Sequence, residues 1–176
     1  MRDPVIMSNS ANCQYMIKLK VGCDEQKEYL FILDTGSTTI LIVGDECNSA
    51  GCLEHNRYLQ SDKCSSKFQE TLGDINPDEI KNIGYGMGDV QYKTKVDDFF
   101  FNSFLVSNQA FASVVSQKSV FDGAYYDGLI GFGYPDLGIS DGMTPIFDNI
   151  MQSGKLKHNV FCLFVSREGS DNSKFF

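Results

Sequence analysis

The feature that most constrains the fold of this chain is an apolar run that stops abruptly at an acid. Residues 29–33 lead directly into Asp34, Thr35 and Gly36, and a second apolar run follows at residues 40–43. An unbroken apolar run bounded by turn residues is typical of a buried strand. A carboxylate at the end of such a strand is costly to desolvate, and the adjacent glycine permits a tight turn. We therefore expect Asp34 to have a chemical role; the alternative is that it only caps a turn.

The composition narrows the classes of protein to which this chain can belong. Its 176 residues are 42% hydrophobic, which suits one domain or one lobe of a larger protein. The 14 Phe and 8 Tyr, without any Trp, favour a β-rich interior. A formal net charge of -8 offers no basic excess to neutralise phosphates, so no nucleic-acid partner is expected. No apolar run is long enough to span a bilayer, and no signal peptide is visible at the start.

Alternating and apolar segments predict an all-β fold. Residues 15–21 alternate strictly and residues 28–33 follow after a polar turn, so the two predict a hairpin that places Asp34 at the end of a sheet. Further strands are expected at residues 40–43, 90–96, 99–106, 111–115 and 160–165. Many strands with one short helix are typical of an all-β domain.

One segment predicts a helix. Thr144 is expected as its N-cap, Pro145 as its first helical residue and Gly154 as its stop. The apolar face of this helix is expected to consist of Ile146, Phe147, Ile150 and Met151.

Two glycine-rich stretches are distinctive. In residues 83–89 three glycines alternate with larger residues before the strand at residues 90–96, which predicts a hairpin with a mobile tip. A phosphate-binding loop is disfavoured there, because a strand rather than a helix follows. In residues 125–135 the apolar pair Leu129 and Ile130 is flanked by glycines, which let backbones approach closely.

The cysteine count indicates an oxidising compartment without fixing the pairing. The six cysteines are Cys13, Cys23, Cys47, Cys52, Cys64 and Cys162. A disulfide between Cys47 and Cys52 would clamp a small loop. Cys13 and Cys23 flank a strand and could form a bridge if the ends of that strand meet.

The alternative for these cysteines is a zinc site. Three cysteines with His55 could bind zinc tetrahedrally, namely Cys47, Cys52 and Cys64. The spacing lacks the Cys-x-x-Cys knuckle usual in such sites, so we expect no metal. His55 is expected to be a polar loop residue, and His158 a solvated surface residue.

Taken in chain order, the segments described above resemble the N-terminal lobe of the pepsin-like (family A1) aspartic proteases. The resemblance runs from about residue 15 to about residue 173. Residues 34–37 look like the first catalytic motif, and the loop from Cys47 to Cys52 sits where the family has a small disulfide. Three further stretches match the flap, the Phe-Asp-Gly-Ile-Leu-Gly-Leu-Gly signature and the helix after it: residues 83–88, 126–135 and 144–150. The resemblance implies an all-β lobe at residues 15–176, a distorted barrel or sandwich with a flap hairpin and one or two short helices. Residues 1–14 would be an N-terminal extension.

The resemblance also implies an aspartic-type endopeptidase that works at acidic pH without a cofactor. Two facing carboxylates share one proton, so that one activates water while the other protonates the leaving amine. Asp34 would be one half of this dyad, and the substrate would be a peptide or protein. Secretion or a lysosomal or vacuolar location is favoured by the resemblance and by the cysteine content.

The residues around Asp34 take supporting roles by the same resemblance. Thr35 would bond across to the partner loop, and Gly36 would let the two loops approach closely. Ser37 would hydrogen-bond the outer oxygen of Asp34. The stretch that crosses under this loop and supports it would be Leu129, Ile130 and Gly131.

The segment that resembles the flap shares some residues with the family and differs from it at others. Tyr85 and Gly86 would close over the bound peptide and exclude water. Met87 and Asp89 stand where the family commonly has small hydroxyl residues. The family usually has a Trp that bonds the flap tyrosine, and Leu41 occupies its place, which leaves Tyr85 less firmly held.

The most consequential departure is that the chain contains one Asp-Thr-Gly and no second Asp-Thr-Gly or Asp-Ser-Gly. The chain matches one lobe, so a second lobe or a second chain must supply the other aspartate. Two alternatives remain open: a truncated or pseudoenzyme lobe that binds peptides without cleaving them, and a homodimeric protease with Asp34 from each chain.

Overall fold

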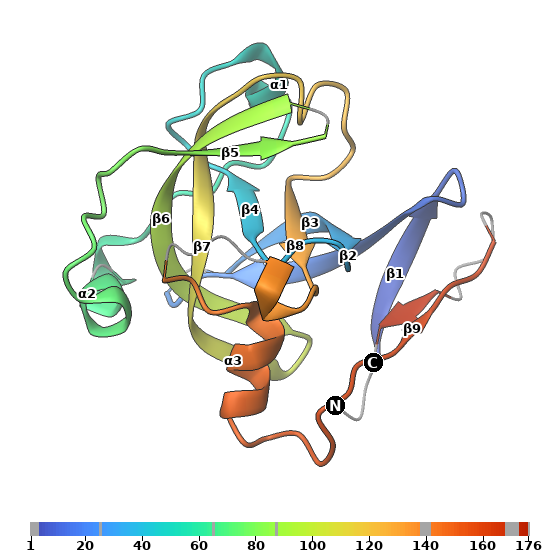
Figure 1. Cartoon of the computed structure of the whole chain (residues 1–176). Helices are drawn as coiled ribbons and strands as arrows, with labels where there is room; N and C mark the ends of the chain where they lie inside the picture. Colours follow the sequence, from blue (N-terminus) through green and yellow to red (C-terminus); the bar gives the residue numbers. More distant parts are fainter. Residues whose placement is uncertain are drawn as a thin grey trace.

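The computed structural model describes residues 4–24, 26–64, 66–86, 88–137, 142–167 and 173–175 (Figure 1). The structure is mostly β-sheet with few short helices, which confirms the predicted all-β class. The strands are β1 (Val5–Ser10), β2 (Gln14–Val21), β3 (Lys27–Asp34), β4 (Ile40–Val43), β5 (Lys81–Tyr85), β6 (Gly88–Phe101), β7 (Phe104–Gln117), β8 (Gly128–Gly131), β9 (Leu163–Phe164) and β10 (Lys174–Phe175). The helices are α1 (Ala50–Leu53), α2 (Ser66–Leu72) and α3 (Ile146–Gln152), with 3-10 turns η1 (Asp62–Cys64) and η2 (Pro135–Leu137).

The described strands join in one sheet that closes on itself. Their order is β5-β6-β7-β4-β8-β3-β2-β1-β10-β9, and β6 also pairs with β2. This second pairing turns β6, β7, β4, β8, β3 and β2 into a closed ring of strands. At one edge β5 and β6 form the flap hairpin, while β1 and β9 extend the sheet to the other side (Figure 1).

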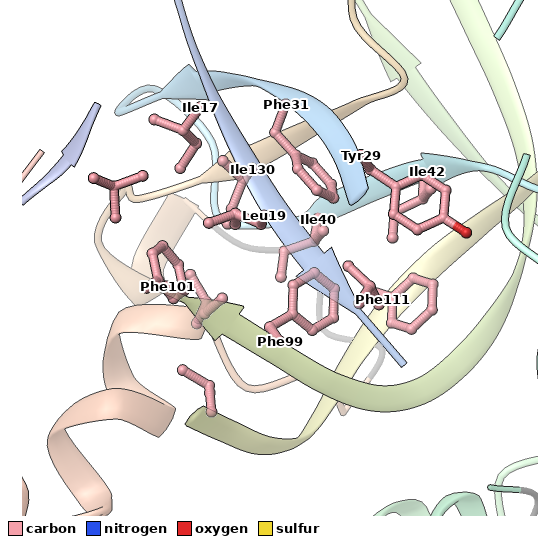
Figure 2. Close-up of a cluster of buried hydrophobic side chains, with 14 of the residues drawn as sticks. Ile17, Leu19, Tyr29, Phe31, Ile40, Ile42, Phe99, Phe101, Phe111 and Ile130 are labelled. Carbon is pink, nitrogen blue, oxygen red and sulfur yellow. The ribbon is translucent and has the colours of Figure 1, made fainter. Parts of the chain in front are cut away.

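The unbroken apolar run of β3 has a simple explanation, because this strand is covered on both faces. Tyr29 and Phe31 belong to one buried cluster, whereas Leu30 and Ile32 pack against a second cluster. The first cluster fills the ring (Figure 2), with side chains that converge from six strands: Ile17, Leu19, Tyr29, Phe31, Ile40, Ile42, Phe99, Phe101, Phe111 and Ile130. Burial of side chains of this size stabilises by about 1.5 to 3 kcal/mol each. The core therefore fixes the strand that ends at Asp34.

The strands predicted near Asp34 have the right extent, whereas some strands predicted farther along the chain have wrong boundaries. The predicted strands at residues 28–33 and 40–43 correspond to β3 and β4. The predicted break between residues 96 and 99 is absent, because β6 runs through the buried Asp97 and Asp98 with an irregular register. These carboxylates are hydrogen-bonded, to Tyr58 Oη at 2.8 Å and to the Asn108 N–H at 3.1 Å, so they do not end the strand.

The hairpin turn between β6 and β7 also falls inside a predicted strand. Asn102, at a φ of 53, makes this turn within the strand expected at residues 99–106. The last predicted strand, at residues 160–165, shortens to β9.

The predicted helix exists, but it begins one residue later than expected. Pro145 rather than Thr144 is the N-cap, and no side chain caps the helix. Gly154, with a φ of +66, ends it as predicted. Ile146 and Ile150 are buried, as expected for the apolar face.

Two disulfides are present, and one of them joins cysteines whose pairing the sequence left open. Cys47 is bonded to Cys52, as the family resemblance implied, and Cys23 is bonded to Cys64 rather than to Cys13. Cys13 and Cys162 are free and exposed. The three sulfurs of the alternative zinc site are all in disulfide bonds, so they are not available as thiolate ligands.

Residues 5–10, which the sequence places in an N-terminal extension, form β1 within the sheet and pair with β2 and β10. The division of the chain at residue 14 stays a prediction. Among the described helices, none has the length and apolar character needed to cross a membrane.

Candidate active site

Asp34 is the last residue of β3 and sits half-buried where the strand opens into an exposed loop. Its Oδ1 accepts a hydrogen bond from the Gly36 N–H at 2.8 Å, and its main-chain oxygen accepts one from the Phe132 N–H at 2.7 Å. Thr35 and Gly36 are exposed at the tip of the loop. The loop therefore orients the carboxyl group through its own backbone and presents it at the surface.

The support predicted from Leu129, Ile130 and Gly131 has a clear geometry. These residues lie in β8, which runs between the two strands that flank the Asp34 loop. β8 is parallel to β3, with Asp34 opposite Gly131, and antiparallel to β4, with Leu41 opposite Leu129. Both arms of the loop are thus bonded to the same central strand.

The loop also closes directly on β8 and on the residues that follow it. The Gly131 N–H donates to Thr39 O at 3.2 Å, and the Gly133 N–H donates to Ser37 O at 2.7 Å. A Cβ atom at Gly131 would lie 2.6 Å from Ser37 O, so this close approach requires glycine.

Ser37 does not behave as expected. Its Oγ is buried and has no hydrogen-bond partner, so the bond predicted from Ser37 to Asp34 is not formed. The backbone of Ser37 is instead held toward β8 by Gly133, and the Gly36 N–H is the donor to Asp34 Oδ1.

The flap hairpin brings Tyr85 toward Asp34. Burial, reinforced by the negative charge of Asp34, raises the pKa of Tyr85 to about 12, so the phenol stays neutral at acidic and neutral pH. The Tyr85 hydroxyl is buried without a partner. The predicted site residue Met87 lies outside the described residues, and Asp89 is exposed on the hairpin.

The lack of a partner for Tyr85 agrees with the departure seen in the sequence. Leu41 is fully buried in the cluster against which Tyr85 packs, and its side chain has no polar atom to offer the phenol. Both buried hydroxyls near the Asp34 loop, Ser37 Oγ and Tyr85 Oη, therefore lack protein partners.

His55 lies in a loop, as predicted, but its side chain is buried there, whereas His158 is exposed as expected. The His55 side chain is only 4% exposed, with Nδ1 3.8 Å from Asp127 Oδ1 and Nε2 3.1 Å from Phe121 O. Sequence reasoning also missed Asp127, a buried carboxylate immediately before β8. The available signal was an acid next to a glycine in an apolar stretch, the same pattern that marked Asp34.

The arrangement offers one oriented, half-buried carboxylate whose charge acts on Tyr85 of the neighbouring hairpin. Such a group can take a proton from water or give one to a leaving group. Hydrolysis through a shared proton needs a second carboxylate facing Asp34.

Comparison with known proteins gives a family match over nearly the whole chain. A family model described as eukaryotic aspartyl protease matches residues 14–176. Aspartic protease 3 of Toxoplasma gondii is 32% identical over 151 residues, which is 82% of this chain and 22% of that protein. Plasmepsin IX of Plasmodium falciparum is 30% identical over 169 residues, which is 93% of this chain and 26% of that protein.

A third relative is the embryonic pepsinogen of Gallus gallus. It is 30% identical over 161 residues, which is 91% of this chain and 39% of that protein. The chain thus spans 22% to 39% of the length of these three relatives.

Proposed function

Because the chain belongs to the eukaryotic aspartyl protease family, we propose that it provides the Asp34-bearing half of an aspartic endopeptidase. The observation that carries this proposal is the position of Asp34, which is oriented by Gly36 and supported by β8 within a chain that matches the family from residue 14 to residue 176. The substrate is a peptide or protein. Residues 15–176 form the lobe, and no cofactor takes part.

The proposed reaction uses Asp34 with a second aspartate from another lobe or chain. The two carboxyl groups share one proton, because two adjacent charges repel each other. The ionised carboxylate takes a proton from the attacking water, and the protonated one gives its proton to the leaving amine. The backbone bond from Gly36 keeps the Asp34 carboxyl group in one orientation while this happens.

The neighbouring residues position the dyad. Thr35, exposed at the tip of the loop, bonds the partner loop, and Gly36 lets that loop come close. Leu129, Ile130 and Gly131 keep the Asp34 loop in place through β8. Ser37 reaches Asp34 only after a change of its side-chain orientation, since its Oγ has no partner in this structure.

The flap residues act on the substrate. Tyr85 and Gly86 close over the bound peptide and exclude water. Met87 and Asp89, which replace small hydroxyl residues of the family, are expected to alter the pocket on the S1 side. The two disulfides suit an oxidising compartment, so secretion or a lysosomal or vacuolar location is part of the proposal.

A second candidate is a lobe that binds peptides without cleaving them. The two buried hydroxyls without partners, Ser37 Oγ and Tyr85 Oη, favour it, because both belong to groups that would hold Asp34 and the flap. In a third arrangement two copies of this chain each contribute Asp34.

The test is cleavage of a fluorogenic peptide at about pH 4, where one carboxyl of a dyad is ionised. The rate is measured over a range of protein concentrations, with and without a statine-containing inhibitor. Inhibitor-sensitive cleavage is expected when a second lobe supplies the other aspartate. The chain alone is expected to cleave only if two copies of it form the dyad, with a rate proportional to the square of its concentration. Binding of the inhibitor without cleavage, even with the second lobe present, would support the peptide-binding candidate instead.

A further inference from the structure

A buried acid–base pair lies at the opposite end of β8 from Asp34. Asp127 immediately precedes β8 and is 6% exposed. The His55 side chain, 4% exposed, comes from the segment after α1 and places Nδ1 3.8 Å from Asp127 Oδ1. Neither residue takes part in the proposed reaction, and two buried ionisable groups are costly unless they are paired.

Asp127 connects three separate segments. Its Oδ2 accepts from the Leu30 N–H at 2.9 Å and from Asn56 Nδ2 at 3.1 Å, while its Oδ1 accepts from the Asn56 N–H at 2.8 Å. Its own N–H donates to Leu30 O at 2.7 Å, and its carbonyl accepts from the Val43 N–H at 3.0 Å. Hydrogen bonds to an ionised acceptor are about twice as strong as neutral ones. The carboxylate therefore fixes the start of β8 against β3 and against residues 55–56.

The geometry around His55 favours the doubly protonated ring. Nε2 lies 3.1 Å from Phe121 O, and a carbonyl oxygen only accepts, so Nε2 carries a proton. Nδ1 faces the Asp127 carboxylate, which is also an acceptor. A neutral ring would direct its Nδ1 lone pair at a negative charge, whereas an imidazolium satisfies both neighbours.

Within the part of the chain that the structure describes, no other ionisable side chain forms an ion pair with His55. Asp127 is the only charged group there within ion-pair distance of the His55 ring. From the 121–126 segment, His55 meets the Phe121 carbonyl and the Phe121 ring, whose centroid lies 5.8 Å from that of the imidazole. Tyr29, within reach of the Asp127 charge, stays neutral, because burial and that charge raise its pKa to about 12.

We propose that the His55 imidazolium and the Asp127 carboxylate form a positioning pair that holds the Asp34 loop in shape while His55 is protonated. Loss of the His55 proton would leave a lone pair facing the carboxylate and weaken the contact between residues 55–56 and Asp127. The start of β8 would then be less firmly held to Leu30. β8 carries this change four residues along to Gly131, which pairs with Asp34. The consequence for catalysis rests on the proposed function, but the coupling between the two ends of β8 does not.

The experiment is an NMR pH titration of the full ¹⁵N-labelled chain, which needs no enzymatic activity. The chain has 2 histidines, so the His158→Gln variant assigns the ring signals of His55. The reporters at the Asp34 end are the amides of Gly36 and Phe132, which donate to Asp34 Oδ1 and Asp34 O. We expect both amide signals to shift with the same midpoint as the His55 ring.

Two variants decide between positioning and a merely structural role. His55→Gln removes the titration but leaves the bonds of Asp127 to Leu30 and Asn56, so the fold should persist while the shared midpoint disappears. His158→Gln, at an exposed site, should leave the midpoint unchanged. The proposal is overturned if Gly36 and Phe132 do not follow the His55 ring, or if they keep the same midpoint in His55→Gln. Since no activity is measured, failure here is distinct from failure of the proposed protease function.

Discussion

The two ends of β8 place two aspartates in opposite situations. Asp34 is half-buried at an open loop, and its carboxyl group accepts a bond from the Gly36 N–H. Asp127 is buried, and its carboxylate accepts from one side-chain and two main-chain donors. A buried carboxylate that accepts several hydrogen bonds stabilises the fold. A carboxylate near the surface with few hydrogen-bond donors can still exchange protons with water or substrate. The same residue type thus serves two purposes, and the environment decides which.

The largest effect on stability is expected at the buried end. Asp127→Asn removes the charge that pairs with His55 and places an amide group against main-chain donors, so the free energy of unfolding should fall by about 3 to 5 kcal/mol. Urea denaturation measures this change. The matched control is Asp136→Asn at an exposed acid in η2, expected within about 0.5 kcal/mol of wild type. If the two substitutions lower the free energy of unfolding equally, Asp127 contributes no more to stability than an exposed acid does.

A smaller effect is expected where the loop closes on β8. Gly131→Ala places a methyl group 2.6 Å from Ser37 O, so the backbone must move, and the free energy of unfolding should fall by about 1 to 3 kcal/mol. In Gly84→Ala the methyl group would meet its nearest atom, Asp89 Oδ1, at 3.5 Å, so this variant serves as the control in urea denaturation. If both alanines are tolerated equally, the close approach at Gly131 is not essential.

The smallest change in stability is expected from removing tyrosine hydroxyls, where a hydroxyl with a hydrogen-bond partner is compared with one that has none. The buried Tyr58 hydroxyl donates to Asp97 Oδ2 at 2.8 Å, so Tyr58→Phe should cost about 1 to 3 kcal/mol. The buried Tyr85 hydroxyl has no partner, so Tyr85→Phe should be neutral or stabilising by up to about 1 kcal/mol. Thermal unfolding of the two variants side by side compares them. A loss of stability in Tyr85→Phe as large as in Tyr58→Phe would mean that the flap hydroxyl is bonded in solution.

Tyr85 also gives a pH dependence with a definite sign. Its pKa rises from 10.0 to about 12 on folding, chiefly through burial. The stability linked to this group is therefore complete below pH 10.0 and is lost as the pH rises through about 12. Alkaline unfolding curves should show a smaller loss over this range in Tyr85→Phe than in wild type. Identical curves would show that Tyr85 is exposed.

Prediction from sequence succeeded where a local pattern determines the structure. The strands on either side of Asp34 are buried on both faces, so their apolar runs end where the burial ends. The glycine at position 154 stopped α3 as expected, since a helix often ends on a left-handed glycine.

Prediction from sequence failed where a partner distant in the sequence lowers the free-energy cost of burying a polar residue. Asp97 lies in the gap between the strands predicted at residues 90–96 and 99–106, but the hydroxyl of Tyr58 satisfies its carboxylate inside β6. His55 was expected only as a polar loop residue, but Asp127 and the Phe121 carbonyl satisfy its side chain in the interior. The pairing of Cys23 with Cys64 depends on a fold that brings residues 41 positions apart together. None of these partners is encoded in the local sequence.

The most direct test of the account is the cleavage of a peptide by Asp34→Asn beside wild type and Asp136→Asn, all in the same protein context. An amide at position 34 cannot take a proton from water, so the rate should fall by about 100-fold or more. The free energy of unfolding should change by less than about 1 kcal/mol, since Asp34 is half-buried at a loop. Asp136→Asn should cleave at the wild-type rate. Cleavage by Asp34→Asn at the wild-type rate would contradict the assignment of Asp34 to the dyad.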